Sequence, residues 1–218
     1  MQKKMMFSGD ENHRITLADV NVLTQNFREN YSHKGILGGY INTTALQEIV
    51  TQKDAVGVRY YYAIDESGTA VLIFVGANAS GQDLLNGKLA VSAAPYFQTD
   101  ILRQPVPQDK IGLDRASALT RNYRKANRQS FIKGAFFGKN AIQQLVGHEG
   151  MLGIRYFYGL ETDSKRVLIL TGVSHTGEDM VEQILFERGI PCPPYCADFN
   201  PLNSYAKVHG QAVLSQTW

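Results

Sequence analysis

Hydrophobic and polar side chains alternate along two stretches of this chain, residues 56–64 and 152–160. Large apolar or aromatic residues occupy every second position there, and a period of two places them on one face of a β-strand. Turn residues follow each stretch, and then comes a second run that is mainly apolar, at residues 70–75 and 167–171. Such a run is typical of a strand that is covered on both faces. The pattern therefore predicts two β-hairpins.

A different period precedes each hairpin. From Thr16 to Tyr31, apolar residues recur at three- and four-residue steps, as on one face of an α-helix, and residues 116–123 repeat part of this stripe. A shorter stripe of the same kind lies at residues 46–50 and again at 142–146. Each hairpin is thus preceded by two predicted helices, with a short extended piece between them.

The elements recur because the sequence recurs. Residues 15–85 align with residues 111–181 at a constant offset of 96 without a gap, and about 21 of the 71 paired positions are identical. An internal repeat decides the architecture before any single residue does. We therefore predict an α+β fold in which two tandem ααββ repeats form one pseudo-two-fold domain, residues 1–218, with an antiparallel sheet of about four strands flanked by helices. Residues 86–110 would link the repeats, and residues 182–218 would form a cysteine-containing loop and a tail.

The charge of the chain is unevenly divided. The 218 residues carry a net charge of +2, with 44% hydrophobic and 19% charged residues, which is ordinary for a folded protein. Residues 15–85 hold four basic and seven acidic side chains, whereas residues 111–181 hold ten and six. The opposite signs predict an attraction between the two segments, either within the chain or between copies.

A basic stripe lies on the first predicted helix of the second repeat, at Arg121, Arg124, Lys125 and Arg128. A nucleic-acid-binding stripe would need accessible aromatic side chains beside it, and Tyr123 falls on the core side of the helix. We therefore predict a solvated helix face or a contact with the acidic repeat, and no nucleic-acid partner.

No segment approaches the roughly 18–20 consecutive apolar residues that a membrane-spanning helix needs. The amino-terminal residues 1–14 also lack the apolar run of a secretory signal. We expect no membrane partner and a cytoplasmic location, and a trimmed secreted form stays open as an alternative.

The two cysteines of the chain, Cys192 and Cys196, lie in the segment Cys-Pro-Pro-Tyr-Cys. A redox-active dithiol of the thioredoxin type has two intervening residues rather than three. A closed zinc site needs four ligands, and the five histidines show no ligand-pair spacing. We favour a local disulfide that ties down the loop; a metal site and a redox site remain as alternatives, and no cofactor is expected.

Arg59 and Arg155 occupy equivalent positions on the predicted strands, beside Tyr61 and Phe157 and opposite the aromatic face. Under two-fold symmetry the two guanidinium groups would converge on a small anionic ligand between the repeats, because the planar fork of arginine suits such ligands. In the simpler alternative, which we favour, each arginine lies along its sheet or pairs with a nearby carboxylate. The four residues are the candidate ligand-binding site.

A loop with two glycines follows each hairpin, at residues 76–83 and 172–179. Four residues separate the glycines, as in a phosphate-binding loop, but Gln82 and Glu178 stand where that motif requires lysine. The loops are therefore interpreted as turns, and the aspartate that ends each of them is expected to cap a following helix.

Three short segments carry a family resemblance. They are Gly-[Val/Ile]-Arg-Tyr-[Tyr/Phe]-Tyr, the glycine-bounded loop that ends in an aspartate, and Cys-Pro-Pro-Tyr-Cys. Together they resemble a family of bacterial proteins to which no function is assigned, and the resemblance implies no activity and no catalytic residue. Neither a histidine nor an acid–base pair recurs in both repeats. We therefore favour a non-enzymatic binding or assembly protein with a protein partner or self-association; the alternative is an enzyme or small-ligand binder with a site between the repeats.

Overall fold

The computed structural model describes residues 5–31, 37–96, 110–128, 132–181 and 185–204. Within these residues the chain forms four helices and ten strands. They are, in chain order, α1 (Leu17–Tyr31), β1 (Gly38–Asn42), α2 (Thr43–Val50), β2 (Ala55–Ile64), β3 (Ala70–Asn78), β4 (Leu89–Val91), β5 (Ala93–Tyr96), α3 (Leu113–Ala126), β6 (Gly134–Gly138), α4 (Lys139–Val146), β7 (Met151–Leu160), β8 (Arg166–Ser174), β9 (Leu185–Phe186) and β10 (Ile190–Cys192).

The strands form two five-stranded antiparallel sheets where the sequence predicted one sheet of about four strands. Sheet A has the order β5-β1-β7-β8-β9, and sheet B has the order β10-β6-β2-β3-β4. The two predicted hairpins, β2–β3 and β7–β8, therefore lie in different sheets. They do not join edge to edge because another strand pairs with the free side of each hairpin.

In each repeated segment, the strand between the two helices pairs with the hairpin of the other segment. Strand β1 pairs with β7, and β6 pairs with β2. Glycine permits the close approach, since a Cβ atom at Gly38 would overlap the carbonyl oxygen of Tyr156, and one at Gly134 would overlap that of Tyr60. Each segment thus completes the sheet of the other.

The order helix, strand, helix, strand, strand occurs twice, and the bounds of β1, α2, β2 and β3 recur 96 residues later in β6, α4, β7 and β8. The short strands β4 and β9 keep the same spacing outside the aligned segments. The predicted linker contains β4 and β5, and its residues 97–109 lie outside the described residues, as does the tail from residue 205.

The starts of α1 and α2 follow from local capping. Thr16 Oγ1 accepts a hydrogen bond from the Asp19 backbone N–H at 3.2 Å, and the Thr16 hydroxyl donates to the Asp19 carboxylate at 2.7 Å. This reciprocal pair satisfies an otherwise free helix N–H group. At α2, the side chain of Asn42 accepts from the Thr44 backbone N–H at 2.7 Å. Both helices therefore begin at a side-chain cap.

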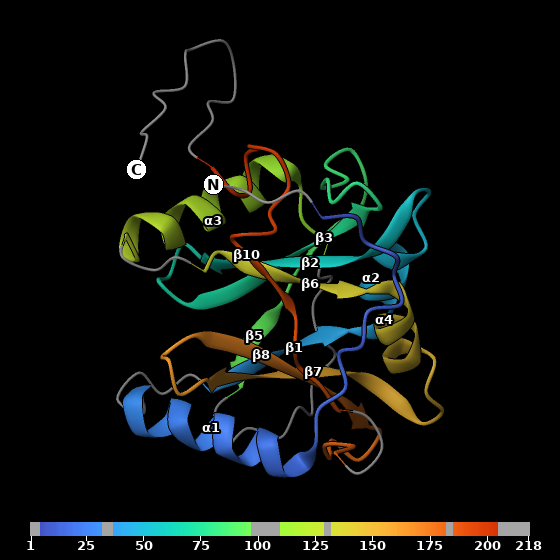
Figure 1. Ribbon diagram of the computed structural model, residues 1–218, viewed down its shortest axis with the longest axis vertical. Helices are drawn as coiled ribbons and strands as arrows, with labels where there is room; N and C mark the ends of the chain where they lie inside the picture. Colours follow the sequence, from blue (N-terminus) through green and yellow to red (C-terminus); the bar gives the residue numbers. More distant parts are fainter. Residues whose placement is uncertain (1–4, 32–36, 97–109, 129–131, 182–184, 205–218) are drawn as a thin grey trace.

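The main core lies between the two sheets (Figure 1). Tyr60 and Tyr62 of sheet B face Tyr156 and Tyr158 of sheet A in this layer, and the apolar faces of α2 and α4 close one side of it. Helix α3 covers the outer face of sheet B, and α1 covers the outer face of sheet A. The layers therefore run α3, sheet B, sheet A, α1.

Two surface ion pairs join the acidic segment to basic side chains, one in the predicted linker and one in the basic segment. Lys110 Nζ lies 2.9 Å from Glu48 Oε1, and Arg115 Nε lies 3.1 Å from Glu66 Oε1. Exposed pairs of this kind contribute about 0–1 kcal/mol each. Part of the predicted attraction between the segments is thus satisfied within the chain. Throughout the described ranges, no helix has the length and apolar character needed to cross a membrane.

Candidate functional site

A loop at the carboxyl-terminal end of the described chain crosses the outer face of sheet B beside α3. We call residues 193–204 the C-terminal loop. A disulfide joins Cys192, the last residue of β10, to Cys196 within the loop, with a Cα–Cα distance of 4.6 Å. Cys192 is completely buried and packs in a cluster with Tyr61, Leu119 and Leu202. Among the residues that the structure describes, no group of His, Cys, Asp and Glu side chains is arranged to hold a metal ion.

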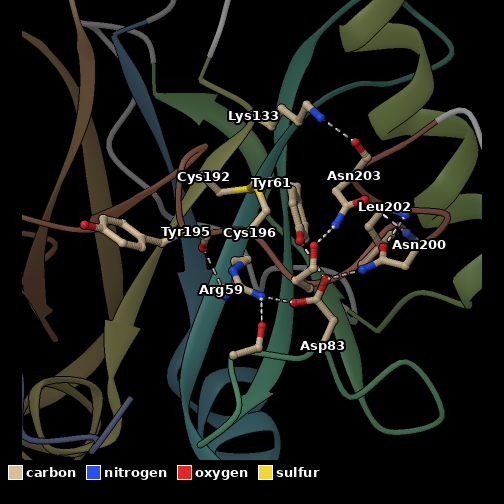
Figure 2. The surroundings of a disulfide bond; sticks show 12 residues. Arg59, Tyr61, Asp83, Lys133, Cys192, Tyr195, Cys196, Asn200, Leu202 and Asn203 are labelled. Carbon is tan, nitrogen blue, oxygen red and sulfur yellow. Dashed lines mark hydrogen bonds and ion pairs between the residues drawn. A yellow bond between two sulfur atoms is a disulfide. The ribbon is translucent and has the colours of Figure 1, made fainter. Parts of the chain in front are cut away.

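Arg59 lies under this loop on the outer face of β2 (Figure 2). Its Nη1 donates to the carbonyl oxygen of Gly81 at 3.1 Å and to Asp83 Oδ1, and its Nη2 lies 3.5 Å from the carbonyl oxygen of Tyr195. The guanidinium carbon also lies 5.8 Å from the centre of the Phe7 ring, a cation–π distance. Burial lowers the pKa of Arg59, Asp83 and Tyr61 raise it, and the net direction is upward. Arg59 is therefore a fixed positive charge.

Asp83 is the partner that neutralises this charge, and its side chain is as fully buried as that of Arg59. Its Oδ2 accepts a hydrogen bond from the Tyr61 hydroxyl at 2.6 Å and from Asn200 Nδ2 at 2.8 Å. Burial raises the pKa of Tyr61, and the neighbouring Asp83 raises it further, so the phenol keeps the proton that it donates. Both carboxylate oxygens are engaged, which leaves Asp83 no role as a general base.

Basic side chains hold the rest of the C-terminal loop by its backbone. Arg124 of α3 donates to the carbonyl oxygens of Leu202 and, at 2.7 Å, of Ser204, and Lys133 Nζ donates to that of Asn203 at 2.9 Å. Burial and the nearby Arg124 lower the pKa of Lys133. The predicted basic stripe is thus only partly a solvated face, because Arg124 is buried against the C-terminal loop.

The equivalent pair in sheet A is Arg155 and Asp179. Arg155 Nη1 donates to Asp179 Oδ1, and Nη2 lies 3.3 Å from the carbonyl oxygen of Gly177. The Asp179 side chain is 24% exposed. Burial raises the pKa of Asp179, and Arg155 opposes this shift. Phe157, which stands where sheet B has Tyr61, offers no hydroxyl and packs with apolar residues of α1.

The structure does not bring the two arginines together. Arg59 and Arg155 lie on the outer faces of different sheets, with the main core between them. The anionic site predicted between the repeats is therefore not formed by these side chains, because each guanidinium pairs with a carboxylate of its own segment. The favoured alternative, pairing with a nearby carboxylate, describes both of them.

Sequence reasoning missed the role of the two aspartates. Asp83 and Asp179 were expected to cap helices, but each forms a β-bridge after its hairpin and binds the arginine. A usable signal existed, since arginine and aspartate recur in both segments with the same separation of 24 residues. Asn200 carried no signal of this kind, because it lies outside the repeated segments.

One side chain of the C-terminal loop points away from the body of the protein. Phe199 is 69% exposed, although the residues on both sides of it are fixed. The Asp198 backbone N–H donates to Gln82 Oε1 at 3.0 Å, and Asn200 is bound to Asp83. The loop therefore presents an aromatic ring on an ordered backbone.

Comparison with known proteins found no matching family model, no matching curated protein and no matching solved structure.

Proposed function

We propose that this protein is a non-enzymatic assembly protein, in which the C-terminal loop of one copy docks on a second copy of the chain. The observation that carries the proposal is the exposure of Phe199 on a loop whose neighbouring residues are all held. A rigid, protruding aromatic side chain is the type of residue that anchors protein interfaces, since it buries a large area at a low cost in conformational entropy.

The buried polar cluster supports a structural role for the groups that would otherwise suggest chemistry. Asp83 accepts from three side chains, and Arg59 donates to three oxygen atoms. An active site needs a titratable group with room for a substrate beside it. The cluster instead holds the C-terminal loop against sheet B, which is what an interaction loop requires.

Charge and exposed apolar surface favour a second copy of the chain as the binding partner of the C-terminal loop. On helix α3, beside the C-terminal loop, three basic side chains and one acidic one lie outside the buried Arg124. Helix α1, on the opposite side of the molecule in Figure 1, carries two acidic side chains and one basic one, and its Val22 is 55% exposed. We propose a head-to-tail contact in which Phe199 packs against the Val22 face of α1. Surfaces on opposite sides of a protomer give a heterologous contact, and such contacts build rings or filaments.

The proposed origin of this architecture is a tandem duplication. The support is the constant offset of 96 residues between the aligned segments and between the bounds of their elements. The repeating unit is then helix, strand, helix and hairpin rather than two helices and a hairpin.

Sedimentation velocity at tens of micromolar, in low and in high salt, tests the assembly. We expect oligomers in low salt that dissociate in high salt, because screening weakens contacts between oppositely charged surfaces. Phe199→Ser and Val22→Ser should each give monomers. Leu152→Ser is the matched control, since Leu152 is also exposed, at 44%, but belongs to β7 and to neither α1 nor the C-terminal loop. A wild-type protein that is monomeric at both salt concentrations would sink the proposal.

A further inference from the structure

We propose that the Cys192–Cys196 disulfide is a redox-responsive clasp, which holds the C-terminal loop closed over the Arg59–Asp83 pair and releases it when a dithiol reduces the bond. The link to assembly rests on the function proposed above. The release of the loop itself does not.

The clasp acts through the residue that it encloses. Tyr195 lies inside the small ring that the disulfide closes, and its backbone N–H donates to the carbonyl oxygen of Pro191 at 3.1 Å. The Tyr195 carbonyl oxygen in turn lies 3.5 Å from Arg59 Nη2. The ring therefore places an acceptor over a buried guanidinium, and Figure 2 shows this carbonyl directed at Arg59 while the phenol ring of Tyr195 points away. Opening the ring removes the constraint that fixes this acceptor.

The disulfide is poorly placed to stabilise the fold as a whole. Its cysteines are only four residues apart in sequence, and a disulfide restricts the unfolded chain least when it closes a short loop. The distal half of the C-terminal loop is held by other means, through Arg124, Lys133 and the completely buried Leu202. The effect of the disulfide is therefore concentrated on residues 193–198, next to the exposed Phe199.

The two cysteine residues differ in exposure, which favours attack at Cys196. Cys192 is completely buried, whereas Cys196 is partly exposed. A thiolate of the reductant attacks Cys196 Sγ, the bond between the two cysteines breaks, and Cys192 leaves as a thiolate and takes up a proton. The second thiol of the reductant then attacks the mixed disulfide, which frees the Cys196 thiol and leaves the reductant as a disulfide. Two electrons and two protons pass to the protein, as thiol–disulfide exchange requires.

The resting state of the disulfide depends on the compartment of the protein. A cytoplasmic location stays a prediction, and disulfides are rare in a cytoplasm kept reducing by thiols. In such a compartment the C-terminal loop would be open by default and would close under oxidation. In an oxidising compartment it would stay closed.

Hydrogen exchange of the full-length protein, measured by mass spectrometry before and after treatment with dithiothreitol, tests the clasp. Thiol titration first establishes that two thiols have formed. We expect the backbone amides of residues 195–198 to exchange at least tenfold faster, while exchange in α3 and β2 stays unchanged. The double variant Cys192→Ala/Cys196→Ala should show the fast exchange without reductant and should not respond to it, which assigns the effect to this bond.

The outcomes separate the clasp from the assembly. Unchanged exchange of the amides of residues 195–198 after complete reduction would overturn the clasp, and so would a loss of protection throughout the sheets. Sedimentation of the oxidised and reduced protein adds the second readout, where loss of oligomers on reduction is expected. If the loop opens but the oxidised protein is monomeric in low salt, the clasp stands and the assembly proposal fails.

Discussion

Arg59 and Asp83 form an ion pair in which neither side chain is exposed to solvent. Removing two charges from water costs several kcal/mol for each ion, and mutual attraction offsets this cost only when the remaining hydrogen-bonding positions are filled. Gly81, Tyr61 and Asn200 fill most of these positions, whereas Arg59 Nε has no hydrogen-bond partner among the described residues. The pair is therefore a fixed point to which the C-terminal loop is attached, and its loss should affect folding before it affects anything else.

Replacing Asp83 by alanine should destabilise the protein strongly. The change leaves the Arg59 charge buried without a partner, and breaking a buried pair in this way typically costs about 3–5 kcal/mol. Asp179→Ala is the matched control, since its side chain is 24% exposed and water can reach the site that the carboxylate leaves. Urea unfolding should show the larger loss for Asp83→Ala. Equal losses in the two variants would contradict the structural difference between the pairs.

Replacing Tyr61 by phenylalanine converts the sheet B pair into the form found in sheet A, where Phe157 stands at this position. Asp83 then loses the hydroxyl that donates at 2.6 Å. Hydrogen bonds to charged groups contribute about 1.5–3 kcal/mol, and we expect a loss of that order in the free energy of unfolding. Tyr195→Phe removes a hydroxyl that points away from the cluster in Figure 2 and should change stability little. A Tyr61→Phe protein as stable as wild type would show that the hydroxyl does not support Asp83.

The hairpins were predictable from the sequence, and the sheets were not. A period of two marks a strand and its faces, so the pattern placed Tyr60 in the core and Arg59 opposite to it. Strand pairing within each sheet depends on contacts between residues far apart in the chain, such as Gly134 with Tyr61, and the periodicity of the sequence does not indicate them. The exchange of β1 and β6 was missed for this reason.

The candidate site divides in the same way. The internal repeat identified Arg59 and Arg155 as candidate site residues, and the recurring aspartates could have identified their partners. The contribution of Asn200 could not be predicted, because it depends on how the C-terminal loop folds back over sheet B. Because this loop shows no periodic pattern of apolar residues, the sequence does not indicate which residues it contacts.

The stability of the protein should fall in mildly acidic solution because of His13. This side chain is buried; its Nδ1 lies 3.0 Å from the carbonyl oxygen of Arg188, and its Nε2 accepts from the Gly138 backbone N–H at 2.9 Å. These bonds require a neutral ring that carries its proton on Nδ1. Burial lowers the pKa of His13, which the bond to Arg188 and the charge of Glu11 only partly offset.

The direction of this change in stability follows from proton uptake by the unfolded chain. Below an ordinary histidine pKa of about 6.5, the unfolded chain binds a proton that the folded protein excludes, so the free energy of unfolding decreases as the pH falls through this window. Each pKa unit between the two states corresponds to about 1.4 kcal/mol.

Urea unfolding from about pH 8 to about pH 5 should show a steeper loss in wild type than in His13→Gln. Replacing the exposed His175 by glutamine should keep the wild-type slope. Burial raises the pKa values of Asp179 and Glu187, which opposes the loss at lower pH, and the comparison between variants removes that contribution. Identical slopes for wild type and His13→Gln would contradict the assignment.

The exchange of β1 and β6 predicts that neither half of the chain folds alone. In an isolated fragment of residues 1–109, β1 would lose β7, and the hairpin β2–β3 would lose β6 from its edge. The tyrosines of sheet B that face sheet A would also be exposed, because the main core is shared by both halves. A hairpin with one free edge and an open apolar face is marginally stable at best.

We expect no cooperative unfolding transition for this fragment or for residues 110–218. Refolding the two together should recover near-wild-type circular dichroism. The full chain cleaved between residues 109 and 110 after folding is the control, and it should keep its structure because none of the described strand pairings is broken. A sharp unfolding transition in either isolated fragment would show that the strands pair differently when the halves are apart.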